Sequence, residues 1–107
     1  GVMSDAEKQG NQLLDALEAA LRHNGLWGNE RPSRQALASQ QPFACDTLAL
    51  EQWLQFIFIP RMQTLLSQSP VSVPVMAIKP VAEITWGAQH LNVQTILGQL
   101  DAWSENP

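Results

Sequence analysis

The segment "EQWLQFIFIPRM", residues 51–62, decides the fold because it is mostly apolar until Pro60 and Arg61 interrupt it. On a helical wheel of about 100° per residue, apolar side chains cover one face and polar ones form a narrow strip. The apolar face consists of Leu50, Trp53, Leu54 and Ile57, and the polar strip of Glu51, Gln52 and Gln55. A helix that is apolar around most of its circumference is usually surrounded by other elements. We therefore expect a central helix with Trp53 and Ile57 inside the core.

Pro60 predicts a change of direction or phase within this helix. Proline lacks an amide proton and disfavours helical geometry at the residue before it, Ile59. In a straight helix Arg61 would fall in the middle of the apolar face, so we expect a kink or restart at Pro60 that turns Arg61 away. A rephased apolar stripe would then run to about residue 68 through Met62, Leu65 and Leu66.

Two outer helices are predicted from apolar residues at helical spacing. Ser4 and Glu7 have the spacing of a capping box, which predicts a helix from about residue 5 to residue 24 that ends at Gly25. Near the other end of the chain, Asn92 is expected to cap a last helix that continues to about residue 104. Its apolar positions are Val93, Ile96, Leu97, Leu100 and Trp103.

Weaker signals lie between the first helix and the central one. Ser33 is expected to cap one or two helical turns through Arg34 to Ala38, and Asp46 or Thr47 to cap the start of the central helix. Trp27 is expected to fold back over the end of the first helix.

Residues 69–81, "SPVSVPVMAIKPV", contain three prolines separated by apolar residues, with Lys79 as the only charge. Spaced prolines favour extended backbone, and a flexible linker would be polar. We expect a strap that lies across the helices and buries alternate side chains; a short edge strand is the alternative. The chain is thus predicted to be one all-α domain, residues 1–107: an irregular bundle of about four helices, with a kink at Pro60 and a proline-rich extended strap packed across it.

Composition narrows the function. The 107 residues carry a net charge of −4, from ten acidic and six basic residues, which argues against direct binding of nucleic acid but not against action on RNA through a partner. The single cysteine, Cys45, cannot form an internal disulfide. No basic-then-apolar signal segment opens the chain, and no apolar run approaches the roughly 18 residues of a membrane span. We expect a cytoplasmic location and no membrane association.

The stretch "QPFACDTLALEQWLQFIFIPRM", residues 41–62, resembles the YqcC-like family, small bacterial proteins described as a domain of unknown function. The residues that carry the resemblance are Pro42, Phe43, Asp46, Thr47, Leu48, Trp53, Leu54, Gln55, Ile59, Pro60, Arg61 and Met62. A first helix that ends before a tryptophan, here Trp27, and a proline-rich segment ahead of the last helix extend it over nearly the whole chain. The resemblance implies an all-helical, irregular bundle without an established activity. Members are often encoded beside a tRNA pseudouridine synthase, which implies an accessory role in tRNA modification.

No motif in the sequence indicates a reaction or a cofactor. Metal-ligand pairs such as CxxC or HxxxH are missing, as are a glycine-rich phosphate loop and a serine elbow. We interpret Cys45 as a small buried side chain, because His23 and His90 lie in turn-like contexts with nothing to orient either ring as a base. We expect no catalytic residue, no metal and no cofactor.

Arg61 is the main candidate contact residue. Its apolar neighbours leave it little water, and a buried arginine needs an anionic or carbonyl partner. One hypothesis is an internal pair with Asp46 or Glu51, in which Arg61 and Asp46 tie the kink to the start of the central helix. The alternative is that Arg61 holds an external anion, either from a partner or from a small ligand.

A second candidate surface surrounds Trp27. Arg22, Arg31 and Arg34 lie near this tryptophan in sequence and would form a small basic and aromatic patch. Three arginines are too few to bind RNA independently, but they suit a contact beside a partner enzyme.

These observations leave three functions open. The first is a non-catalytic cytoplasmic interaction or accessory module that docks a protein partner, with an RNA-modifying enzyme as the candidate. The second is a binder of a small molecule or anionic ligand, or a small enzyme, with a cleft near Arg61 between the strap and the central helix, lined by Met76 and valines. The third is a homodimer formed through the last helix, near Trp103.

Overall fold

The computed structural model describes residues 4–107, and residues 1–3 of the predicted domain lie outside the described residues. In chain order, the elements are α1 (Asp5–His23), α2 (Arg34–Leu37), the 3₁₀ helix η1 (Pro42–Ala44), α3 (Leu50–Trp53), the π-helical η2 (Leu54–Phe58), α4 (Ile59–Leu66), α5 (Lys79–Trp86) and α6 (Leu91–Glu105). The predicted all-α class is confirmed, and the edge-strand alternative is wrong because residues 4–107 contain no strand. None of the described helices is both long enough and apolar enough to cross a membrane.

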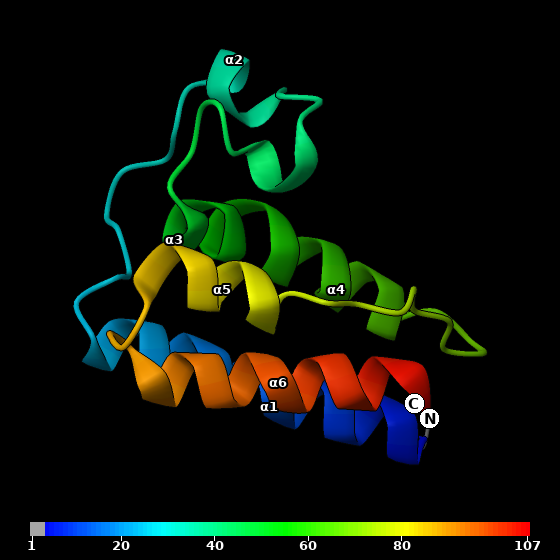
Figure 1. Cartoon of the computed structure of the whole chain (residues 1–107). Coiled ribbons are helices and arrows are strands. Elements are labelled where there is room, and N and C mark those ends of the chain that lie inside the picture. Colours follow the sequence, from blue (N-terminus) through cyan, green and yellow to red (C-terminus); the bar gives the residue numbers. More distant parts are fainter. Residues whose placement is uncertain (1–3) are drawn as a thin grey trace.

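The helices form an irregular bundle (Figure 1). Helices α1 and α6 run antiparallel side by side, α4 packs on α1, and α5 packs on α6. We refer to α3, η2 and α4 together as the rod, since they follow one another without a break in the helix. Residues 34–47, which include α2 and η1, form a lobe on the side of the rod that faces away from α1 and α6 (Figure 1).

The core lies where α1, α6, the rod and α5 meet. Its largest fully buried side chains are Leu17, Leu21, Leu54, Leu66, Val93, Leu97 and Leu100. Trp103 is 4% exposed and belongs to this core. The tryptophan that suggested self-association through the last helix therefore packs inside the protein.

The predicted α1 and α2 are confirmed together with their caps. The Ser4 hydroxyl accepts a hydrogen bond from the Glu7 N–H at 3.1 Å, and the Ser33 hydroxyl accepts one from the Ala36 N–H at 3.1 Å. Gly25 follows α1 with a φ of 70°, a conformation that glycine adopts without steric cost.

The predicted caps of the central and last helices are wrong. Ala49 precedes α3, and its N–H donates to the side-chain oxygen of Gln52 at 2.9 Å. Asp46 instead accepts a hydrogen bond from the Ser39 hydroxyl, and the Thr47 hydroxyl donates to a carbonyl of α2. Both side chains are therefore used to fold the lobe.

At α6 the residue before the helix is His90, with a φ of 56°, and Asn92 lies inside the first turn. The side-chain oxygen of Asn92 accepts a hydrogen bond from the Asn24 side chain at 3.0 Å. Asn92 thus joins the start of α6 to the end of α1, because the antiparallel packing brings these two ends together.

The rod changes phase just before Pro60. The Ile59 N–H donates to the carbonyl of Leu54, five residues earlier, and the backbone of Phe58 stays helical at φ −65° and ψ −55°. A π-turn contains one extra residue, so it rotates later side chains relative to earlier ones and widens the turn into which the proline ring must fit. Arg61 is turned off the apolar face, as predicted, but it is exposed, although its apolar neighbours were expected to leave it little water. The turn at η2 provides the change of phase that the sequence placed at Pro60.

The π-turn also changes which side chains are buried. Phe58 and Ile59 are each 4% exposed, although neither belongs to the apolar face that the helical wheel predicted. Trp53 and Ile57, expected in the core, are only half-buried, and Gln55, expected on the polar strip, is buried. A wheel drawn for a straight helix fails here because it assumes a single helical phase, whereas the π-turn divides this segment into two helical phases.

The strap is confirmed over residues 71–78, which lie outside any helix and run alongside α4 (Figure 1). It ends at Ile78 because α5 begins at Lys79, earlier than the predicted limit of residue 81. Val71, Val73, Met76 and Ile78 pack against the core. Between them the strap exposes Ser72, Pro74, Val75 and Ala77.

Candidate functional site

A surface cleft of about 470 Å³ lies between the lobe and the rod, and we term it the lobe cleft. It is lined by Arg31, Leu37, Ser39, Gln41, Pro42, Phe43, Ala44, Trp53, Phe56, Ile57 and Arg61. Arg31 comes from the connection before α2 and Arg61 from the first turn of α4. Folding therefore brings together two candidate residues that lie far apart in the sequence.

Two of the residues that line this cleft, Phe43 and Trp53, belong to a cluster of packed aromatic rings. Phe43 meets Trp53 edge to face with 4.8 Å between ring centroids, and Trp53 stacks on Phe58 at 5.4 Å. Phe43 and Ala44 have φ values of 59° and 49°, in the left-handed region that costs non-glycine residues roughly 1–2 kcal/mol each. This turn sets the Phe43 ring against Trp53. Sequence reasoning missed the role of Phe43, because no local pattern predicts left-handed backbone at a phenylalanine.

A second cleft, of about 260 Å³, lies between the strap and the rod, and we term it the strap cleft. It is lined by Phe43, Trp53, Phe58, Arg61, Met62, Leu65, Pro74, Val75, Met76, Ala77 and Ile78. This is the place where the sequence predicted a cleft near Arg61. Phe43, Trp53 and Arg61 line both clefts, and neither cleft has an aspartate or glutamate among its lining residues.

Two polar side chains of α6 hold the strap in place. The Ser104 hydroxyl accepts a hydrogen bond from the Met76 N–H at 2.8 Å. The Asp101 carboxylate accepts from the N–H groups of Ile78 and Lys79, both at 2.9 Å. Sequence reasoning missed both residues, although each follows a core leucine of α6 by four positions, a spacing that indicates the buried face of a helix.

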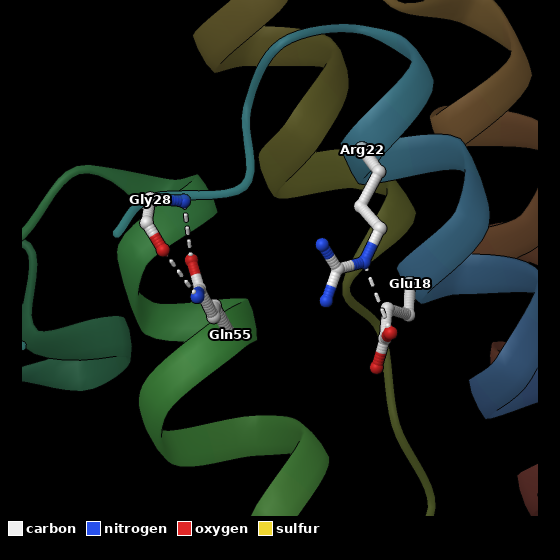
Figure 2. Close-up of polar contacts among 4 residues, drawn as sticks. All are labelled: Glu18, Arg22, Gly28 and Gln55. Carbon is white, nitrogen blue, oxygen red and sulfur yellow. Dashed lines mark hydrogen bonds and ion pairs between the residues drawn. The ribbon is translucent and has the colours of Figure 1, made fainter. Parts of the chain in front are cut away.

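Gln55 fixes the connection after α1 to the rod (Figure 2). Its side-chain oxygen accepts a hydrogen bond from the Gly28 N–H at 2.8 Å, and its side-chain nitrogen donates to the Gly28 carbonyl at 2.9 Å. Figure 2 also shows the Arg22 side chain, which contacts Glu18 at 3.1 Å. The Arg22 guanidinium lies 4.7 Å from the ring centroid of Trp27, so Trp27 folds back over the end of α1 as predicted.

The predicted internal ion pair of Arg61 is wrong. Within residues 4–107 the one ion pair is between Arg22 and Glu18. Arg61 is exposed, while Asp46 is bonded to Ser39. The π-turn points Arg61 toward water, where its charge needs no internal partner.

The predicted patch around Trp27 is divided between separate places. Arg22 lies over Trp27, Arg31 lines the lobe cleft, and Arg34 is exposed on α2. Arg34, Asp46 and Trp27 are not among the residues that line either cleft. Of the five candidate site residues, Arg31 and Arg61 are the two that share one cleft.

The interpretations of Cys45 and His90 are corrected by the structure. Cys45 is exposed rather than buried, because it follows the left-handed turn at Phe43 and Ala44 on the lobe surface. The His90 ring is oriented by Asn24, with 3.1 Å between its Nδ1 and the side-chain oxygen, and by an edge contact with Trp86. Across the described residues, no group of three His, Cys, Asp or Glu side chains is arranged to hold a metal ion.

The fold and the clefts define an all-helical protein with two adjoining surface clefts, and sequence comparison places it in a family. Residues 9–105 match the family described as "DUF446: tRNA pseudouridine synthase C". The chain therefore belongs to this family, which is the YqcC-like family that residues 41–62 resemble.

Similar proteins support this membership. The chain is 36% identical to the uncharacterized protein YqcC of Escherichia coli over 88 residues, covering 82% of this chain and 81% of that one. It is 39% identical to an uncharacterized protein of Haemophilus influenzae over 75 residues, covering 70% and 71% of the two chains. The solution NMR structure of protein YqcC from E. coli matches with a TM-score of 0.83 at 31% identity, over 96% of this chain and 91% of that chain.

One relative is much longer. The tRNA pseudouridine synthase C of Pectobacterium carotovorum is 41% identical to this chain over 68 residues, which are 64% of this chain and 18% of that protein. A segment similar to this chain is thus a small part of a protein with that name.

Proposed function

We propose that this protein is a non-catalytic accessory module of the cytoplasm that binds an RNA-modifying enzyme of the pseudouridine synthase class. The observation that carries the proposal is the segment similar to this chain within a protein named tRNA pseudouridine synthase C. Two modules joined in one polypeptide meet at an effective concentration that reaches the millimolar range with a short flexible linker. A module on a separate chain needs an interface with the enzyme to be held equally close to it.

The chemistry of the two clefts supports binding rather than catalysis. Their walls combine aromatic and aliphatic side chains with guanidinium groups, which hold a ligand but do not act as nucleophile or base near neutral pH. The Ser39 hydroxyl, which lines the lobe cleft, donates to Asp46. A serine nucleophile would need a basic partner such as histidine to accept its proton.

The charge of the chain supports a protein partner over direct contact with tRNA. A net charge of −4 repels a polyphosphate, and only six basic residues are available to neutralise it. In this proposal the synthase binds the tRNA, and the accessory module contacts the synthase.

The proposal is tested by mixing the full chain with purified tRNA pseudouridine synthase C from the same organism. Sedimentation velocity at roughly 20 µM of each protein should show a complex, since interfaces of ordinary size bind with micromolar or tighter affinity. A pseudouridine synthase of another class is the matched control and should sediment alone. Separate sedimentation of the cognate pair, or direct binding of tRNA by the isolated chain, would contradict the proposal.

The strap cleft supports a second candidate function, the binding of a small anionic ligand. Arg61 stands at the edge of a cleft whose other lining residues are apolar, which suits a carboxylate with a short hydrocarbon body. Its volume of about 260 Å³ is below the usual range for drug-sized ligands, so such a ligand would be small. Aliphatic and aromatic carboxylates at millimolar concentration should then raise the melting temperature of the wild type but not of Arg61→Gln. If the carboxylates change the melting temperatures of the wild type and of Arg61→Gln equally, this candidate function is excluded.

A further inference from the structure

The lobe cleft concentrates positive charge in an acidic protein. Arg31 and Arg61 are two of only six basic residues in the chain, and both line this one cleft. No acidic residue lines it, and the single ion pair found within residues 4–107 involves neither arginine. Both guanidinium groups can therefore accept an anionic partner without first breaking an internal bond.

The cleft also has a preorganised apolar wall. Trp53 is held between Phe43 at 4.8 Å and Phe58 at 5.4 Å, and the left-handed backbone at Phe43 and Ala44 fixes the turn that carries the Phe43 ring. Rings that are fixed before binding lose little conformational entropy when they receive a ligand. A small inorganic anion would use the arginines and leave this wall unused.

We propose that the lobe cleft binds a short segment of a partner protein in which acidic side chains flank an apolar one. The carboxylates would pair with Arg31 and Arg61, since guanidinium groups form bidentate hydrogen bonds with carboxylates. The apolar side chain would lie on the Trp53 wall, as anchor residues do in other interfaces. This inference rests on the proposed function for the partner being a protein, and it names the surface and the chemistry of the contact.

The cleft is tested with the full chain and a blocked probe peptide of sequence Asp-Asp-Leu-Trp-Asp-Asp. The matched control peptide has asparagine at each aspartate position. Two-dimensional ¹⁵N–¹H NMR titration should shift the amide signals of residues 39–44 and the Trp53 indole signal. The acidic peptide should bind at least roughly tenfold more tightly than the amide peptide, and its affinity should fall with added salt.

Substitutions assign the contact to the two arginines. Arg31→Gln and Arg61→Gln should each weaken binding of the acidic peptide by roughly fivefold or more, since each removes a charge-assisted hydrogen bond. Arg34→Gln is the matched control, because Arg34 is exposed on α2 and does not line the cleft. Spectra of the free variants should show that all three remain folded, since the three side chains are exposed.

Several results would overturn the inference. Equal affinity for the two peptides, or full affinity in the Arg31→Gln and Arg61→Gln variants, would remove the role of the arginines. Displacement of the peptide by equimolar single-stranded RNA or by inorganic phosphate would show a nucleic-acid or simple anion site instead. If the chain binds the peptide but does not bind the synthase, only the proposed function is contradicted. Synthase binding that survives the double variant Arg31→Gln/Arg61→Gln contradicts only this inference.

Discussion

Gln55 is a polar residue in the most hydrophobic segment of the chain, and its side chain bonds to backbone groups of Gly28. Gly28 lies in a connection without regular structure, so its N–H and carbonyl have no helical neighbours to bond with. The Gln55 amide satisfies both groups at 2.8 and 2.9 Å. The connection after α1 is thereby fixed to the rod at one point.

Replacement of Gln55 by leucine tests this contact. The change keeps the side-chain volume but leaves the Gly28 N–H and carbonyl without their partner, so we expect unfolding to become easier by about 1–2 kcal/mol. Urea denaturation measures the loss. Gln63→Ala is the control, because Gln63 is exposed on α4 and such surface changes alter stability by less than about 0.5 kcal/mol. Similar values for the two variants would mean that the Gln55 contact does not stabilise the fold.

Gly10 allows close packing inside α1. A Cβ atom at this position would lie 2.7 Å from a methyl carbon of Leu66 and 2.8 Å from the ring of Trp103. At Gly98, in α6, a Cβ atom would lie 2.9 Å from the Cδ of Lys79, a flexible side chain that can move. The same substitution should therefore have different effects in the two helices.

We expect Gly10→Ala to destabilise the protein, since overpacking costs about 1–3 kcal/mol and outweighs the gain of up to about 1 kcal/mol in helix propensity. Gly98→Ala should be neutral or stabilising, because the propensity gain remains and Lys79 can rotate away. Urea denaturation of both variants provides the comparison. A Gly10→Ala protein as stable as the wild type would show that the α1, α4 and α6 contact is looser than described.

At the scale of elements, α6 positions the strap and the start of α5 together. The Asp101 carboxylate bonds to the N–H groups of Ile78 and Lys79, which stand at the start of α5, so it acts as a helix cap supplied by another helix. The strap cleft therefore depends on a residue that does not line it.

Asp101→Ala should release the end of the strap. Loss of hydrogen bonds to a charged acceptor costs about 1.5–3 kcal/mol, and the amide protons of Ile78 and Lys79 should exchange faster with deuterium. Asp15→Ala, at an exposed aspartate of α1, is the control and should leave both amides unchanged. Unaltered exchange at Ile78 in Asp101→Ala would contradict the capping role.

Elements with local signals could be predicted from the sequence. Ser4 and Ser33 predicted two helix starts correctly because a cap and its partner lie within three residues of each other. The π-turn at η2 could not be predicted, because an apolar run shows no difference between α and π phasing, and this exchanged the positions of Trp53 and Phe58 relative to the core. The predicted caps at Asp46 and Asn92 are wrong because both helices begin at other residues: Ala49 precedes α3, and His90 precedes α6. The two side chains bond to Ser39 and Asn24 instead.

At the scale of the whole molecule, the clefts arise from packing between segments distant in sequence. The sequence identified Arg61 and predicted a cleft between the strap and the central helix, and the structure contains one there. It could not place Arg31 in the same cleft as Arg61, since nothing local determines how the lobe packs against the rod. Arg34 and Trp27 were grouped with Arg31 by sequence proximity, which tertiary structure does not preserve.

The most direct measurement is hydrogen–deuterium exchange of the full chain alone and mixed with the cognate pseudouridine synthase. We predict slower exchange of residues 39–44 in the lobe and residues 53–61 in the rod when the synthase is present, with exchange in α1 and α6 unchanged. Protection confined to α1 and α6, or identical exchange with and without the synthase, would contradict this prediction.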